Sequence, residues 1–201
     1  MSTEEYLKDI TEIKDMMNKS SRFFSLSGLS GIMAGIYALI GAAIAYYLVS
    51  ISGRDYLILD GRIFNYILLD LVAVALLSII TAIILSTRKA KKNNETLWNG
   101  TSKRLLIAFL IPLITGGIYI TIKIFSSHYG LTGSLMLIFY GLALVNASKY
   151  TIGNVKYLGY VEIVLGLICA VYPGYGFWFW VLGFGVMHIL YGSLIYLKHD
   201  R

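Results

Sequence analysis

Two apolar runs near the C-terminus, residues 156–172 and 177–197, are separated only by the four-residue turn Pro173–Gly176. Each run approaches the length of about 20 residues that an α-helix needs to cross the hydrocarbon core of a bilayer. Lys156 and Lys198 stand at the ends remote from the turn, and the turn itself carries no charge. Because backbone groups inside lipid must be hydrogen-bonded within their own segment, this pattern predicts a transmembrane helical hairpin.

The remainder of the chain has the same apolar character. Apolar residues make up 57% of the sequence and charged residues 14%, whereas soluble domains average about 45–50% and about 25%. A soluble domain could not bury so much apolar surface, so lipid must be the solvent for most of it. The sequence predicts an all-α membrane protein with six transmembrane helices in three sequential antiparallel hairpins, residues 26–198, and a cytoplasmic tail, residues 199–201. The predicted spans are residues 26–49, 64–86, 105–125, 131–148, 156–172 and 177–197.

The segment before the first span has a different pattern. Its apolar residues recur at helical spacing, and charged residues fill the opposite face. This spacing predicts an amphipathic helix over residues 2–19, within a cytoplasmic segment, residues 1–25. The helix could lie on the membrane or against the bundle, or it could dock on a cytoplasmic protein partner or a second protomer. The apolar positions are Tyr6, Ile10, Ile13 and Met17.

Positive charges are distributed unevenly over the predicted loops. Fourteen Lys and Arg residues lie in the N-terminal segment, in residues 87–104, in residues 149–156 and at the C-terminus. The opposite side has Arg54 and Arg62 in its loops and Lys123 close to it. Because cytoplasmic loops carry the excess of Lys and Arg, we expect both termini in the cytoplasm. The predicted location is the inner, cytoplasmic membrane of a bacterium, an origin that the frequent Ile, Lys, Asn and Tyr residues suit.

The loop after the second span holds the densest cluster of charge. Its six cations stand against a single acid, Glu95. This pattern is typical of a topology signal that contacts anionic lipid headgroups, and a regulatory docking site is the alternative. Charges confined to short loops between apolar runs do not indicate nucleic acid as a partner. The predicted headgroup contacts are Arg88, Lys89, Lys91, Lys92, Lys103 and Arg104.

Small residues mark the helix faces on which close packing is expected. Such residues allow two membrane helices to approach each other closely. The stripes predict helix packing inside the chain, with contact in a homo-oligomer as the alternative. They consist of Ser27, Gly31 and Gly35 in the first span, Gly159 and Gly166 in the fifth, and Gly185 and Gly192 in the sixth.

A weak internal repeat relates the predicted hairpins. The fourth and sixth spans share a tyrosine followed by a glycine, Tyr140-Gly141 and Tyr191-Gly192. Three hairpins in the same orientation could therefore be parallel repeats about an axis along the membrane normal.

Glu162 and His188 lie inside the two apolar runs of the last hairpin. Counted from the turn, they fall within roughly one helical rise, about 1.5 Å, of the same depth. Ionisable groups at membrane depth are costly and call for a partner, so we expect these two side chains to approach each other. The pair could be a buried hydrogen bond that fixes the hairpin register, or a site that binds a proton or ligand. Tyr191 and Tyr160 offer the nearest hydroxyls by sequence.

Asp70 is a further ionisable residue inside a predicted span, roughly two turns from its outer end. It joins Glu162, His188 and Tyr191 among the candidate ligand or proton residues. Asp70 could pair with Lys123 of the neighbouring hairpin, or both side chains could reach to water.

The sequence contains no recognisable catalytic, nucleotide or metal motif. His128, His188 and His199 fall at three different depths, and the single cysteine, Cys169, lies in an apolar run. We therefore expect no cofactor and no enzyme activity. The favoured hypothesis is a small polytopic inner-membrane protein of sensing, interaction or membrane-stress type. The alternative is a small transporter or channel for protons, ions or a small apolar ligand that uses Glu162 and His188.

Overall fold

The computed structural model describes Ile10 and residues 27–51, 62–92, 99–126, 128–151 and 155–199. Apart from Ile10, which is helical and exposed, the predicted amphipathic helix over residues 2–19 lies outside the described residues. The described residues form six helices, which confirms the predicted all-α class. Five of them are α2 (Gly28–Ile51), α3 (Arg62–Lys92), α4 (Gly100–Phe125), α5 (Thr132–Ala147) and α6 (Val155–Val171).

The sixth helix is continuous but changes its winding along its length. It consists of α7 (Gly176–Trp180), the π-helical η3 (Val181–Met187) and α8 (His188–His199), here called the C-terminal helix. The short 3₁₀ turn η2 (Pro173–Tyr175) connects it to α6, and a second one, η1 (Ser148–Tyr150), follows α5. The predicted Pro-Gly turn therefore ends one helix and begins the next, as Pro at the start of a helical turn favours.

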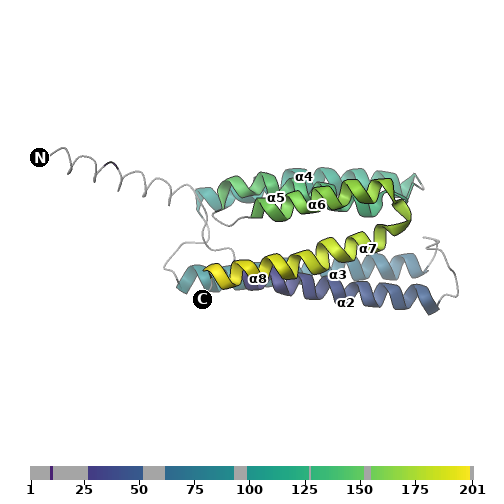
Figure 1. Ribbon diagram of the computed structural model, residues 1–201, viewed down its shortest axis with the longest axis horizontal. Helices are drawn as coiled ribbons and strands as arrows, with labels where there is room; N and C mark the ends of the chain where they lie inside the picture. Colours follow the sequence, from purple (N-terminus) through teal and green to yellow (C-terminus); the bar gives the residue numbers. More distant parts are fainter. Residues whose placement is uncertain are drawn as a thin grey trace, which may run out of the picture.

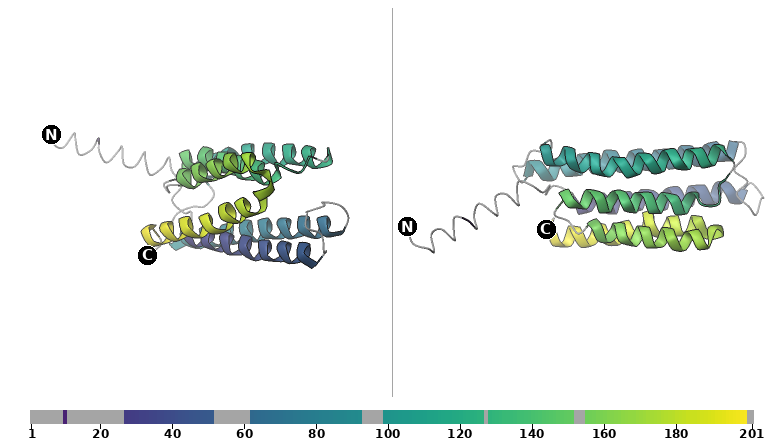
Figure 2. Two further views of the ribbon diagram at one scale, coloured as in Figure 1. Left: turned by 45° about the vertical axis from the view of Figure 1, so that its right-hand side comes forward. Right: turned by 90° about the horizontal axis from the view of Figure 1, so that it is seen from above.

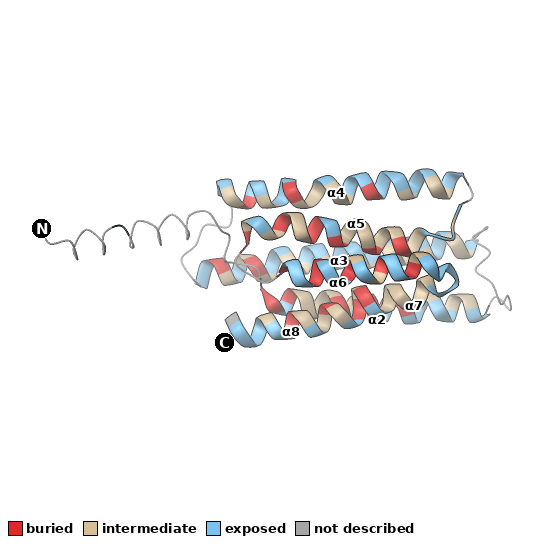
Figure 3. Cartoon of the chain, turned by 45° about the horizontal axis from the view of Figure 1, so that its top comes forward, coloured by how far each residue is buried: buried red, intermediate tan, exposed pale blue. Residues whose placement is uncertain are grey.

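Four helices are long and apolar enough to cross a membrane: α2, α3, α4 and the segment Pro173–Lys198. They indicate a multi-pass membrane protein. Outward-facing side chains on these helices are exposed and largely apolar, whereas buried residues gather where helices meet (Figure 3). α5 and α6, with 16 and 17 residues, are shorter.

The six helices form a bundle of two layers (Figures 1 and 2). The first layer holds α2 at its centre, with α3 on one side and the C-terminal helix on the other. The second layer holds α5 at its centre, between α4 and α6. α6 and the C-terminal helix thus leave the same turn but enter different layers, and α6 meets the C-terminal helix mainly along α7 and η3.

Glycines allow the central helix of each layer to touch its neighbour. A Cβ atom added to Gly35 of α2 would lie 2.6 Å from the carbonyl oxygen of Gly185. In the second layer, a Cβ atom on Gly141 would lie 2.6 Å from the carbonyl oxygen of Gly159. The structure thus places the small residues singled out in the sequence at contacts within the chain. Gly31 meets Gly192, Gly166 meets Ser134, and Ser27 is buried at the start of α2.

Candidate functional site

The side chain of Glu162 is fully buried between the two layers, with 0% of its surface exposed. It projects from α6 against the backbone of Gly183 in η3, where a Cβ atom would lie 2.5 Å from Oε2 of Glu162. A residue larger than glycine at position 183 would therefore occupy the space of the carboxyl group. Leu137 of α5, also fully buried, closes the same space from the second layer.

His188 contributes the second ionisable group of this site. Its Nδ1 atom lies 3.5 Å from Oε1 of Glu162. The predicted approach of these two side chains is therefore confirmed. The same Nδ1 lies 3.0 Å from the carbonyl oxygen of Gly183, and Nε2 lies 2.8 Å from the hydroxyl of Tyr140. A neutral imidazole with its proton on Nδ1 donates to Gly183 and accepts from Tyr140, so all its polar atoms are satisfied.

The π-helical winding of η3 places His188 in this arrangement. A π-helix is rare and occurs frequently at functional sites. The backbone N–H of His188 donates to the carbonyl of Gly185 and not to that of Gly183. The carbonyl of Gly183 instead accepts a hydrogen bond from the imidazole ring of His188. Apart from Gly183 and Gly185, no feature of the sequence indicated this winding, because a single π turn leaves the hydrophobic pattern of an α-helix almost unchanged.

Tyr140 of α5 is the site residue that sequence reasoning missed. Its ring lies 5.3 Å from the ring of His188 and 5.0 Å from that of Phe184. The expected hydroxyls take no part in the His188 contact: Tyr160 is half-exposed, and the hydroxyl of Tyr191 is buried without a hydrogen-bond partner. The repeated Tyr-Gly pair at Tyr140 and Tyr191 was the one signal that could have singled out Tyr140.

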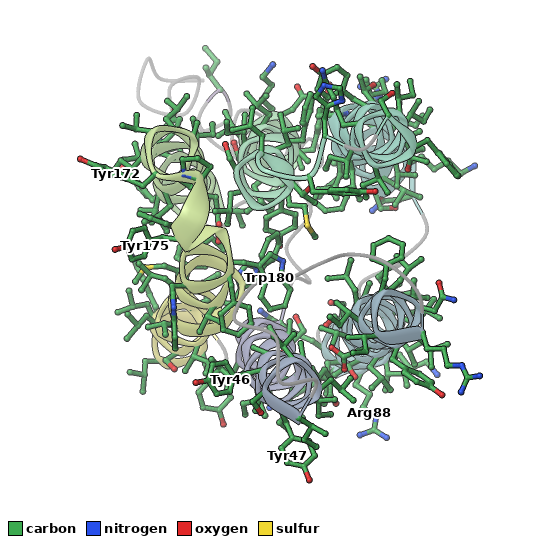
Figure 4. All side chains as sticks on the ribbon, turned by 90° about the vertical axis from the view of Figure 1, so that its right-hand side faces the viewer. Tyr46, Tyr47, Arg88, Tyr172, Tyr175 and Trp180 are labelled. Atoms are coloured by element: carbon green, nitrogen blue, oxygen red, sulfur yellow. The ribbon has the colours of Figure 1, made fainter. Side chains whose placement is uncertain are left out.

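Four buried polar atoms in the described part of the chain lack a hydrogen-bond partner. They are both carboxyl oxygens of Glu162, the indole nitrogen of Trp180 and the hydroxyl oxygen of Tyr191. Trp180 points into the space between the layers (Figure 4), and the ring of Tyr191 packs against Leu144 and its neighbours. Such orphaned groups cost about 1–3 kcal/mol each and are rare in native structures. The contact between the layers therefore holds unpaired polar atoms beside the hydrogen-bonded pair of His188 and Tyr140.

The electrostatics of the Glu162–His188 pair follow from this burial. Two arrangements leave the pair without net charge: a carboxylic acid beside a neutral imidazole, and a carboxylate beside an imidazolium. Gain or loss of one proton leaves an uncompensated charge in a dry contact, which is expensive. A change in the number of bound protons is thus coupled to the packing of the two layers.

Asp70 lies elsewhere in the bundle. Its carboxyl group faces α2, where a Cβ atom on Gly41 would lie 3.1 Å from Oδ2 of Asp70. The ammonium group of Lys123 lies 5.6 Å from the centre of the Tyr119 ring. Among the described residues no ion pair joins Asp70 to Lys123, so the pairing considered from the sequence is absent. Asp70 therefore lies within the first layer, on α3, and its carboxyl group faces α2 and not the Glu162–His188 pair.

Comparison with known proteins finds no family model, no curated protein and no solved structure that matches this chain. Within the described residues, no group of three or more His, Cys, Asp and Glu side chains could hold a metal ion. The fold and site define a helical bundle with four candidate membrane spans and a buried group of carboxyl, imidazole and phenol. Its function must be argued from the chemistry of that group.

Alanine at position 183 should destabilise the protein and disturb the pair. The added Cβ atom would meet Oε2 of Glu162 and Cδ2 of Leu137, both at 2.5 Å. Because both atoms end flexible side chains, we expect a loss of stability near the lower end of the range of about 1–3 kcal/mol for overpacking. The melting midpoint in mild detergent measures it. Gly174→Ala is the control, since nothing lies within 4 Å of that position. Equal midpoints for the two variants would show that the carboxyl group does not rest on Gly183.

Proposed function

We propose that this chain is a six-span inner-membrane protein of the sensing or membrane-stress type that responds to the protonation of Glu162 and His188. One observation carries this proposal: the carboxyl group of Glu162 is fully buried and without a hydrogen-bond partner, 3.5 Å from His188. Ionisable residues at membrane depth are retained chiefly for function. A purely structural clasp would be expected to satisfy both carboxyl oxygens.

The positions of the two short helices support the six-span topology, and their lengths allow it where the bilayer thins. α5 and α6, with 16 and 17 residues, run beside longer apolar helices (Figure 1). At 1.5 Å per residue they are about 24–26 Å long, against a hydrocarbon core of about 30 Å that can thin locally. The excess of Lys and Arg supports a cytoplasmic location for both termini.

The position of the pair suggests how protonation would be transmitted. Glu162 and Tyr140 belong to the second layer, whereas His188 belongs to the first. A net charge on the pair would favour separation of the layers and entry of water, because hydration lowers the cost of the charge. The change would then reach a cytoplasmic protein partner through the N-terminal segment, residues 2–19.

Trp180 provides an optical probe of this response. Its ring lies 5.2 Å from that of Phe184, which in turn lies 5.8 Å from that of His188. With Trp98 and Trp178 replaced by phenylalanine, we expect the emission of Trp180 to titrate with pH, since separation of the layers would hydrate the indole. The same background carrying Glu162→Gln and His188→Gln should give a flat profile. A titration unchanged by these two substitutions would contradict the proposal.

A proton or ion path is the second candidate function. The polar atoms of Trp180, Glu162 and Tyr191 are buried and unpaired, as groups along a polar path through the bundle would be. Proton flux into proteoliposomes distinguishes the candidates. A flux that Glu162→Gln abolishes would favour transport, and a pH-dependent Trp180 signal without flux would favour sensing.

A further inference from the structure

Helices α3 and α4 occupy one edge of the bundle without packing against each other. α3 packs along α2 and α4 packs along α5; within the described residues, the two do not pack along each other although they follow one another in the chain. Seen end on, both stand on the same side of the molecule, one at the end of each layer (Figure 4). We call this pair of facing helices the α3–α4 edge.

The membrane-embedded part of this edge is apolar. Exposed side chains on α3 include Leu76, Ile80 and Ile83, and those on α4 include Ile107 and Ile111. In α3 only Ser86 and Ala90, near its C-terminal end, are buried in the structure. Such surfaces match acyl chains, but acyl chains alone would not distinguish this edge from any other lipid-facing helix.

Positive charges at the cytoplasmic end of the α3–α4 edge distinguish this edge from other lipid-facing helices. Lys92 is exposed at the end of α3, and Lys103 and Arg104 are exposed at the start of α4, whereas Arg88 points away from α4 (Figure 4). Seven residues, 93–99, join the two helix ends, so these ends lie within about 25 Å of each other by the reach of the chain. Cations from both helices thus flank the same apolar edge where it meets the membrane surface.

We propose that the α3–α4 edge binds an anionic phospholipid. Its phosphate would lie among the cations of the two helix ends, and its acyl chains would lie against the apolar side chains of α3 and α4. A second copy of the chain is a less favourable occupant than a lipid. Two copies that met through this edge would bring their cation clusters together, and these clusters would repel each other. A lipid phosphate instead neutralises them, as basic sites between membrane helices do at the cytoplasmic surface. This inference does not depend on the Glu162–His188 site.

The test uses phosphatidylglycerol and phosphatidylcholine that carry the same photoactivatable acyl chain. The full-length protein in nanodiscs is irradiated, and labelled positions are mapped by peptide mass spectrometry. We expect phosphatidylglycerol to label residues 76–86 and 105–114 several-fold more than other helical segments, and several-fold more than phosphatidylcholine does. The triple variant Lys92→Gln, Lys103→Gln, Arg104→Gln should lose this preference. The control Lys156→Gln, Lys198→Gln removes two exposed cations from α6 and α8, away from the edge, and should retain it.

Three results would overturn the proposal. The first is labelling spread evenly over the helices, and the second is equal labelling by the two lipids. The third is crosslinking of α3 or α4 to a second copy of the chain, which would assign the edge to a dimer interface. If the triple variant does not fold, competition on the wild-type protein replaces it. Excess unlabelled phosphatidylglycerol should then suppress the labelling, and phosphatidylcholine should not.

Discussion

Replacement of Glu162 by methionine should raise the melting midpoint of the protein. Both carboxyl oxygens are buried without a hydrogen-bond partner, and an unpaired buried polar group costs about 1–3 kcal/mol in proteins. Methionine has a similar length and a flexible apolar side chain, so it can fill the same space beside Gly183. We therefore expect stabilisation by about 1–3 kcal/mol, together with loss of the pH response at Trp180. Thermal unfolding in mild detergent measures the first, and fluorescence titration the second.

Substitutions of His188 and of its hydrogen-bond partner Tyr140 should change the stability in the opposite direction. His188→Leu leaves the hydroxyl of Tyr140 and the carbonyl of Gly183 without their ring partners, at a cost of about 1–3 kcal/mol each. Tyr140→Phe removes one hydrogen bond and should cost about 1 kcal/mol. The double variant Glu162→Met, His188→Leu completes a thermodynamic cycle. If Glu162→Met destabilises as much as His188→Leu and the two are strongly coupled, the pair is a structural clasp and the sensing proposal loses its basis.

Alanine at position 141 should be strongly destabilising. The added Cβ atom would lie 2.6 Å from the carbonyl oxygen of Gly159 and 2.9 Å from the backbone nitrogen of Ile163. Backbone atoms of a helix cannot rotate away as side-chain ends can, so α5 and α6 would have to separate. We expect a loss in the upper part of the range of about 1–3 kcal/mol for overpacking. The melting midpoint in detergent again provides the measurement.

Gly117→Ala is the matched control for this substitution. Gly117 lies in α4, and nothing lies within 4 Å of the position of its Cβ atom. The change should be neutral or stabilise the helix by up to about 1 kcal/mol, because alanine has the higher helix propensity. A midpoint for Gly141→Ala that equals that of Gly117→Ala would contradict the close crossing of α5 and α6.

The candidate site could be predicted from the sequence in part. Depth counted outward from a short turn is fixed by the helical rise, so Glu162 and His188 could be placed at one level. Tyr140 could not be found this way, because it lies in α5 and no short turn fixes its depth or direction relative to the last two helices. The π-helical turn that directs His188 toward Gly183 also escaped prediction. One altered turn changes the direction of a side chain while the apolar pattern stays the same.

The amino-acid sequence by itself determined that the chain is all-helical and has several segments able to cross a membrane. The cost of an unpaired backbone group in lipid leaves few other structures for runs such as residues 28–51. It also indicated which faces pack closely, since glycines such as Gly159 and Gly192 permit approaches that larger residues exclude. Only the tertiary structure decided that α6 and the C-terminal helix enter different layers, and that α3 and α4 form an open edge. Apolar helices in lipid gain little hydrophobic energy from any particular neighbour, so hydropathy does not determine which helices pack together. Steric fit between the helix surfaces determines it instead.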